Sequence, residues 1–294
     1  MDGLKRIKSM HEFIETDKDQ GVERTYMYDS KRSHHIHTHR QEIDILDSAI
    51  WGKMLFLDRT LQSTSRDEMI YHYALVHPLL EILDNRQEIL ILGGGEGATA
   101  REILRWNGVE KVVQVDYDEE LVAYMKKDKT WSKGAYDDKR VQCVYQDAWA
   151  YIKVSLPFNG IVVDLTDPDL KNEDWEDLLF NLMIRVAGRR GGFVINAGLY
   201  VPWNVETIKA LRAIVEKLCT DFPGYKYHIY TAMIPSFNGE WTFIAMTRST
   251  NFMKEPEHSV YIPEWIRRQI RTLTNAVIDT PTALIIQPSL ERIY

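Results

Sequence analysis

A glycine-rich turn between a predicted strand and a predicted helix is the first feature of the sequence that suggests chemistry. Residues 89–100 read Ile-Leu-Ile-Leu-Gly-Gly-Gly-Glu-Gly-Ala-Thr-Ala. Within them Gly93, Gly95 and Ala98 have the G-x-G-x-x-G/A spacing, which lets the backbone approach a bound nucleoside closely. Asp116 closes the next predicted strand about twenty residues later, where an acidic residue suits ribose hydroxyls. The pattern predicts a nucleoside-binding turn.

Glu96, inside this turn, indicates which kind of nucleoside is bound. The N-terminus of a helix attracts anions, so a pyrophosphate is the usual ligand of such a turn. A carboxylate at this position opposes a phosphate and favours a cation. We therefore expect a sulfonium compound such as S-adenosylmethionine or a relative rather than NAD.

Further carboxylates stand at the ends of predicted strands. In chain order the set is Glu96, Asp116, Asp147, Asp164 and Asp167. The carboxyl ends of neighbouring parallel strands line one crevice, so these groups are expected to converge there. Their mutual repulsion is costly unless a cationic ligand offsets it. Each also has a simpler interpretation: Asp147 and Asp167 could cap the helices that follow them. Asp164 is harder to dismiss, because it ends a β-branched run.

The elements that must position these residues alternate from about residue 67 onwards. The sequence predicts strands at 88–92, 111–116, 141–145, 161–164 and 192–196, and helices at 69–83, 98–106, 119–127, 175–186 and 205–218. Near-continuous apolar strands indicate a parallel sheet covered on both faces. We therefore predict an α/β, doubly wound Rossmann-like domain over residues 67–294. Segments 227–234 and 241–247 flank Asn238-Gly239, a strong hairpin signal, so the sheet should end in an antiparallel pair.

Residues 1–66 have a different pattern. Short alternating segments at 42–46, 51–57 and 61–64 are separated by the turn residues Asp47-Ser48 and Asp58-Arg59. This pattern predicts a small antiparallel β domain at the N-terminus.

Composition excludes several classes of protein. The 294 residues carry a net charge of −7, which argues against a nucleic-acid partner because phosphate binding needs clustered cations. We interpret Arg267–Arg271 as part of an amphipathic helix with one solvated face. The two cysteines form no disulfide framework, and no apolar run suggests a signal peptide or a membrane span. A cytoplasmic protein that does not bind membranes is the expectation.

Taken together, the ordered motifs resemble those of the polyamine aminopropyltransferases of the spermidine-synthase type. The resemblance is carried by residues 93–97, 116–118, 147–148 and 164–168, by 57–64, 67–68, 71–72 and 76–78 upstream, and by 234–237 downstream. It covers about residues 40–247 in the family's order. Single motifs are shared with class I methyltransferases, but the combination is specific.

The resemblance implies a reaction and a role for each site residue. Decarboxylated S-adenosylmethionine gives its aminopropyl group to a small amine, leaving 5′-methylthioadenosine; no metal and no permanently bound cofactor are expected. Donor-binding residues by position are Gln41, Gln62, Gly93, Gly95, Glu96, Asp116, Asp147 and Ala148. The expected catalytic residues are Asp164 as general base, Tyr71 and Asp167, with His72, Asp167 and Phe237 at the acceptor. A homodimer or homotetramer is also implied.

The acceptor amine stays open between putrescine, agmatine, spermidine and spermine. Glu96 in the turn and Phe237 in place of a tyrosine resemble the thermospermine, triamine or agmatine-using branches. Tyr73 stands where the family has glutamate, and Lys171–Asp177 replaces the usual gatekeeping loop.

Two other functions fit the same pocket. One is an amine N-methyltransferase using intact S-adenosylmethionine, against which Glu96 argues because that donor carries a carboxylate. The other is a non-catalytic relative that binds polyamine or nucleoside. Separately, His34, His35, His37 and His39 form a cluster, but no cysteine or nearby pair of carboxylates completes a metal site.

Overall fold

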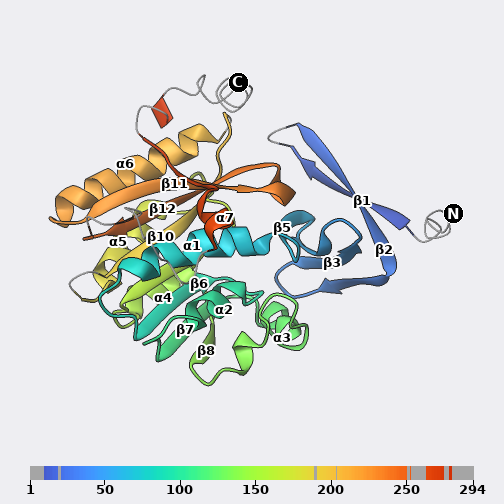
Figure 1. The fold of residues 1–294 in the computed structure, drawn as a ribbon, viewed down its shortest axis with the longest axis horizontal. Coiled ribbons are helices and arrows are strands. Elements are labelled where there is room, and N and C mark those ends of the chain that lie inside the picture. Colours follow the sequence, from blue (N-terminus) through green and yellow to red (C-terminus); the bar gives the residue numbers. More distant parts are fainter. Residues whose placement is uncertain are drawn as a thin grey trace.

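Two β-sheets, joined through helix α1, make up the molecule (Figure 1). The computed structural model describes residues 10–18, 21–188, 191–202, 204–249, 252, 263–274 and 278–279. The N-terminal sheet is antiparallel and has the order β1-β2-β3-β4-β5. Its strands are β1 (Met10–Asp17), β2 (Val22–His37), β3 (Glu42–Ser48), β4 (Gly52–Leu57) and β5 (Thr60–Thr64). The small β domain that the sequence predicts is present.

The second sheet has eight strands in the order β13-β11-β12-β10-β9-β6-β7-β8. They are β6 (Glu88–Gly93), β7 (Lys111–Asp116), β8 (Val141–Tyr145), β9 (Gly160–Asp164), β10 (Gly192–Leu199), β11 (Lys226–Ile234), β12 (Gly239–Thr247) and β13 (Ile270–Thr272). Strands β6 to β10 pair in parallel, whereas β12 pairs antiparallel with both β10 and β11. The predicted doubly wound, Rossmann-like fold and its closing hairpin are confirmed.

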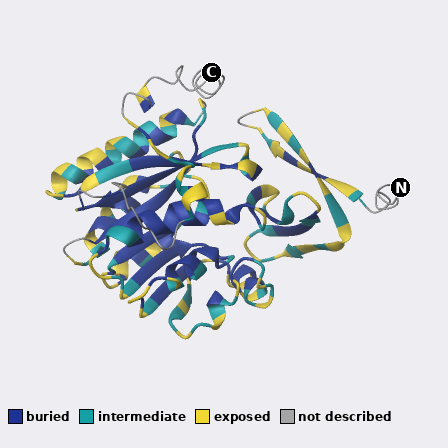
Figure 2. Ribbon diagram, in the orientation of Figure 1, coloured by how far each residue is buried: buried dark blue, intermediate teal, exposed yellow. Residues whose placement is uncertain are grey.

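Alternating side chains of the strands build two apolar layers on the two faces of this sheet. The helices are α1 (Glu68–Ile82), α2 (Ala98–Leu104), α3 (Glu119–Lys127), α4 (Ala148–Val154), α5 (Trp175–Arg185), α6 (Val205–Asp221) and α7 (Glu264–Arg267). Ile89 and Ile91 of β6 pack in the layer with α1 and α2, while Leu90 and Leu92 pack in the layer with α4, α5 and α6. Burial on both faces explains why these strands are apolar throughout (Figure 2).

A third, smaller core joins the two sheets. Ile43 and Ile45 of β3 pack with Leu121 and Met125 of α3 and with the fully buried Trp131. Strand β5 ends at Thr64 and α1 begins at Glu68, which is close to the boundary that we propose between domains 1–66 and 67–294. The apolar contact places the N-terminal sheet beside the region that follows β7.

The strand order reverses next to β6. The chain passes from β6 to β7 and β8 on one side, and β9 and β10 lie on the other side. Ligands of open α/β sheets bind at such a switch point, beyond the carboxyl ends of the strands. Gly93 at the end of β6 pairs with Asp164 at the end of β9, so the glycine turn and this carboxylate meet there.

One local prediction is wrong. Arg267–Arg271 does not lie in a single helix, because α7 ends at Arg267 and β13 begins at Ile270. Pairing of β13 with β11, which makes β13 the edge strand, overrides the helical spacing. Among the described residues, no helix combines the length and apolar character needed to cross a membrane.

Candidate active site

A cleft of about 550 Å³ lies between the N-terminal sheet and the switch point of the second sheet. Twelve of the thirteen predicted site residues line it: Gln41, Gln62, Tyr71, His72, Gly93, Gly95, Glu96, Asp116, Ala148, Asp164, Asp167 and Phe237. They come from both sheets and from α1. Folding therefore brings together residues that are up to about 200 positions apart in the sequence.

The glycine turn lines the cleft, and it needs glycines because a Cβ atom would collide with the neighbouring strand ends. Gly93 has φ +85°, and a Cβ there would lie 2.2 Å from the backbone oxygen of Asp164. That oxygen accepts a hydrogen bond from the Gly94 N–H at 2.9 Å. A Cβ on Gly95 would lie 2.7 Å from Oδ2 of Asp116. The glycines thus let the turn reach both neighbouring strand ends.

Asp164 is held by two hydroxyl groups. Tyr71 donates to Oδ1 at 2.9 Å, and Thr99 donates to Oδ2 at 2.5 Å. Burial raises the pKa of Asp164 to about 6, and the charge of Glu96 adds to this effect. Burial and the charge of Asp164 also raise the pKa of Tyr71, so its hydroxyl stays protonated. A carboxyl group with this pKa can accept a proton near neutral pH.

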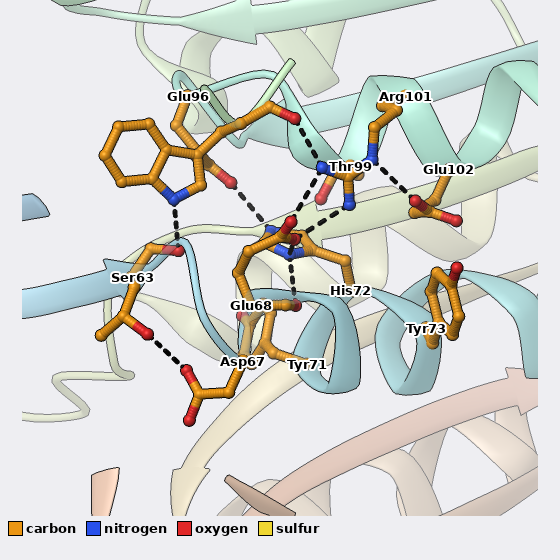
Figure 3. Close-up of polar contacts among 12 residues, drawn as sticks. Ser63, Asp67, Glu68, Tyr71, His72, Tyr73, Glu96, Thr99, Arg101 and Glu102 are labelled. Carbon is orange, nitrogen blue, oxygen red and sulfur yellow. Dashed lines mark hydrogen bonds and ion pairs between the residues drawn. The ribbon is translucent and has the colours of Figure 1, made fainter. Parts of the chain in front are cut away.

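His72 lies between two carboxylates, as Figure 3 shows. Nδ1 is 2.9 Å from Oε2 of Glu68 and Nε2 is 2.8 Å from Oε1 of Glu96. Burial alone would lower the pKa of His72, but the hydrogen bonds to Glu68 and Glu96 outweigh it and raise that pKa well above the usual value. His72, Glu96 and Asp164 are close enough to hold a metal ion. An imidazolium has no lone pair for one, however, because both ring nitrogens carry protons.

Asp116 lies at the far side of the glycine turn. Its Oδ1 accepts from the backbone N–H of Asp118 at 2.9 Å. Burial raises the pKa of Asp116 to about 6, despite that hydrogen bond. Gln41, from the N-terminal domain, donates to Oδ2 of Asp118 at 2.8 Å and so reaches the same end of the cleft.

Asp167 and Phe237 lie at the other end. Asn196 is 3.4 Å from Oδ1 of Asp167, and the surrounding protein raises the pKa of Asp167 to about 6 although its side chain faces the open cleft. Phe237 packs on Trp241 with ring centroids 4.3 Å apart. Next to it, Ser236 donates through its backbone N–H and its hydroxyl to Asp67, at 2.7 and 2.9 Å. Asp67 therefore fixes the segment that carries Phe237.

Residues 68–256 match the model of the spermine/spermidine synthase domain. A polyamine aminopropyltransferase of Saccharolobus solfataricus is 34% identical over 238 residues, which cover 79% of this chain and 77% of the relative. The polyamine aminopropyltransferase 2 of Caldanaerobacter subterraneus subsp. tengcongensis is 36% identical over 242 residues, covering 79% of both chains. For the enzyme of Aeropyrum pernix the identity is 34%, over 69% of this chain and 65% of the relative.

The chain belongs to the spermine/spermidine synthase family. Its fold agrees with solved members. The spermidine synthase from Thermotoga maritima superposes with a TM-score of 0.77 at 21% identity, over 92% of this chain and 94% of that one. A spermidine synthase in complex with the transition-state analogue AdoDATO gives a TM-score of 0.75, also at 21% identity, over 93% and 95% of the two chains.

Asp147 is the one predicted site residue that does not line the cleft. It is exposed and caps α4, where its Oδ1 accepts from the backbone N–H of Ala150 at 2.8 Å. Its neighbours Gln146 and Ala148 do line the cleft. The capping interpretation therefore accounts for this hydrogen bond, and the role of Asp147 toward the nucleoside stays a prediction.

Two departures from the family pattern lie away from the cleft lining. The Tyr73 hydroxyl accepts from Arg105 at 2.6 Å and packs inside the layer between α1 and α2. Trp175 is buried at the start of α5, next to Trp149. Of the three residues that set this sequence apart at the acceptor side, Phe237 alone lines the cleft.

Sequence reasoning missed the contribution of the β1–β2 hairpin. Glu15, Asp17, Arg24 and Tyr26 line the cleft. Glu15 accepts from the Tyr26 hydroxyl at 2.8 Å and from the Leu61 N–H at 2.9 Å. In the sequence, Glu15 lies two residues after Phe13 on a short strand. This spacing is a weak sign of a binding residue, since exposed strands have the same pattern. The docking of the hairpin was needed to find it.

Proposed function

We propose that this member of the family is a transferase of polyamine biosynthesis that moves the aminopropyl group of decarboxylated S-adenosylmethionine to a small amine. One observation carries the proposal: Asp164, held by Tyr71 and Thr99, faces a cleft whose walls carry several further carboxylates. Such a cleft suits a cationic donor and a cationic acceptor together. The relatives named above are polyamine aminopropyltransferases, in agreement with this reaction.

The donor occupies the half of the cleft nearest the glycine turn in this proposal. Asp116, Gln41 and Gln62 hold the nucleoside, Ala148 and Asp147 lie at its base, and Glu96 takes the ammonium group of the aminopropyl chain. The donor is a substrate, and no resident cofactor or metal takes part.

The acceptor amine must lose a proton before it attacks. An alkylammonium group has a pKa of about 10.4, so releasing its proton at pH 7 costs about 4–5 kcal/mol. Asp164 accepts that proton, and the Tyr71 hydroxyl keeps its carboxylate in place. The free amine then forms the N–C bond as the C–S bond breaks, and the bonding pair returns to sulfur to give the neutral 5′-methylthioadenosine. Alignment of both reactants supplies much of the remaining acceleration.

The second half of the cleft sets the acceptor. Asp167 binds an ammonium group of the acceptor, and Phe237 offers an apolar surface where a tyrosine would offer a hydroxyl. Putrescine, agmatine, spermidine and spermine are the candidates, and a Phe237→Tyr variant should change the preference among them. We also propose a homodimer or homotetramer in the cytoplasm, which light scattering and cell fractionation test.

The deciding assay combines two donors with four acceptors. Decarboxylated or intact S-adenosylmethionine is offered with each of the four amines, and both nucleoside products are measured. We expect 5′-methylthioadenosine from the decarboxylated donor. Release of S-adenosylhomocysteine from the intact donor would instead indicate an N-methyltransferase, and binding without either product a non-catalytic relative.

A further inference from the structure

We propose that Glu68 is a positioning residue that acts through His72 on Glu96 and thereby orders the aminopropyl end of the donor. This inference rests on the proposed function, in which Glu96 takes the ammonium group. Glu68 does not line the cleft, but His72, to which its side chain is hydrogen-bonded, does.

A continuous set of short contacts connects Glu68 to the cleft (Figure 3). Arg101 donates to both carboxylate oxygens of Glu68, each at 2.9 Å. Glu68 accepts from Nδ1 of His72 at 2.9 Å, and the backbone oxygen of Glu68 is 2.7 Å from the same nitrogen. Nε2 of His72 then reaches Oε1 of Glu96 at 2.8 Å. The His72 side chain is only 3% exposed, so water cannot replace these partners.

Charge alternates along this path. Arg101 is positive, Glu68 negative, His72 positive and Glu96 negative, and Glu96 faces the cleft. A cation in the cleft beside Glu96 would continue this alternation, and the aminopropyl ammonium group of the donor is such a cation. Among the described residues, His72 alone makes a side-chain hydrogen bond with Glu96. His72 thus decides how Glu96 is oriented.

Glu68 matters because three carboxylates act on His72. They are Glu68 from α1, Glu96 from the glycine turn and Asp164 from the end of β9. Glu68 is the one of the three that a second cation, Arg101, fixes by a two-pronged contact. Loss of the Glu68 charge weakens its interaction with the imidazolium ring of His72, so the pKa of His72 falls and the ring loses its proton at a lower pH. A neutral His72 leaves Glu96 and Asp164 as two uncompensated carboxylates.

The test compares Glu68→Gln with Glu102→Gln. Gln at 68 keeps the size and one acceptor but removes the charge. Glu102 is the control: its side chain is also buried, at 3% exposure against 9% for Glu68, and it binds Arg101 at 2.7 Å, but no hydrogen bond or ion pair joins it to His72 among the described residues. Affinities for decarboxylated S-adenosylmethionine and for 5′-methylthioadenosine, which lacks the aminopropyl group, are measured between pH 6 and 9.

We expect Glu68→Gln to weaken donor binding about tenfold or more, as for loss of a charged hydrogen bond. Affinity for 5′-methylthioadenosine should change by less than about twofold, because this ligand lacks the aminopropyl group that Glu96 binds in our proposal. As the pH rises, the donor affinity of Glu68→Gln should begin to decline at a lower pH than that of the wild type, because His72 loses its proton earlier. Glu68→Asp should restore part of the donor affinity. The control variant should lose stability but keep the wild-type ratio of the two affinities.

Equal weakening of both ligands in Glu68→Gln, or the same ratio in both variants, overturns the positioning role. If the variant does not fold, ring-nitrogen NMR of His72 in the wild type decides, because a ring that is neutral at pH 7 also overturns it. Wild-type release of 5′-methylthioadenosine is measured separately, so a failure of the proposed function is recognised independently.

Discussion

Two groups of ionisable side chains lie within the same domain and differ in whether cations of the protein contact their carboxylates. Between α1 and α2, Glu102 binds His77 at 3.0 Å, Arg101 at 2.7 Å and Arg105 at 2.6 Å. At the strand ends, Asp116, Asp164 and Asp167 line the cleft with hydroxyl, amide or backbone partners but no cation in direct contact among the described residues. We call the first the paired cluster and the second the open carboxylates.

The pKa values express this difference. Burial would raise the pKa of Glu102, but the hydrogen bond with His77 and the charge of Arg101 outweigh it and lower that pKa to about 2. Burial raises the pKa of Asp116 and of Asp164 to about 6, whereas Asp167 has a raised pKa although it is exposed in the cleft. Asp116, Asp164 and Glu102 are all partly or fully buried, so the presence or absence of a cation of the protein beside the carboxylate decides whether its pKa is lowered or raised. The paired cluster is complete in itself, whereas the open carboxylates are completed by a cationic ligand.

The largest expected effect is on turnover in Asp164→Asn. Loss of the general base should lower kcat by about 10²–10⁴, while donor affinity changes little because Glu96 and Asp116 remain. The wild-type kcat/KM should fall as the pH decreases below about 6, since protonated Asp164 cannot accept a proton. Steady-state kinetics with a donor-binding isotherm check both points. Wild-type turnover in the variant would remove Asp164 from the mechanism.

The next effect is on stability in Glu102→Ala. Removing one partner of a buried ion pair should lower the free energy of unfolding by about 3–5 kcal/mol, because Arg101, Arg105 and His77 lose a shared carboxylate. Urea denaturation measures the change, with circular dichroism as the control for folding. A loss below about 1 kcal/mol would mean that the paired cluster is not a stabilising unit.

A smaller effect, of the opposite sign, is expected for the stability of Asp164→Asn. The folded-state pKa of about 6 lies above the ordinary value of 3.8. The contribution of the Asp164 carboxyl group to the free energy of unfolding is therefore fully present below pH 3.8 and is lost as the pH rises through 6. Asparagine avoids that loss. The variant should be more stable by about 1–2 kcal/mol at pH 8 and equal to the wild type near pH 4. Thermal melts at the two pH values test it, and a destabilised variant at pH 8 contradicts the comparison.

The smallest effect concerns an exposed ion pair. Glu264 and Arg268 lie 3.0 Å apart, with side chains 68% and 77% exposed. Glu264→Gln should change the free energy of unfolding by less than about 0.5 kcal/mol, because water screens the pair. Denaturation beside Glu102→Ala measures it. A loss similar to that of Glu102→Ala would show that pairing, rather than burial, carries the energy of the paired cluster.

Much of the donor side could be predicted from sequence. A strand, a glycine turn and a helix are recognised locally, and the rule for parallel strands then places Gly93, Asp116 and Asp164 at one edge. Asp147 shows the limit of that rule. It also follows a strand, β8, and its neighbours Gln146 and Ala148 line the cleft, but its own side chain caps α4. The rule for strand ends places the backbone and does not decide which way a side chain turns.

The sequence by itself determined the fold class, the glycine turn, the closing hairpin and the carboxylates, because periodicity and turn chemistry act over a few residues. The tertiary structure decided which carboxylates of one helix meet cations of another. Glu68 of α1 meets Arg101 of α2, and Glu102 of α2 meets His77 of α1. It also brought Glu15 and Asp17 of the β1–β2 hairpin into the cleft. Both arrangements depend on contacts between distant segments, for which no local pattern exists.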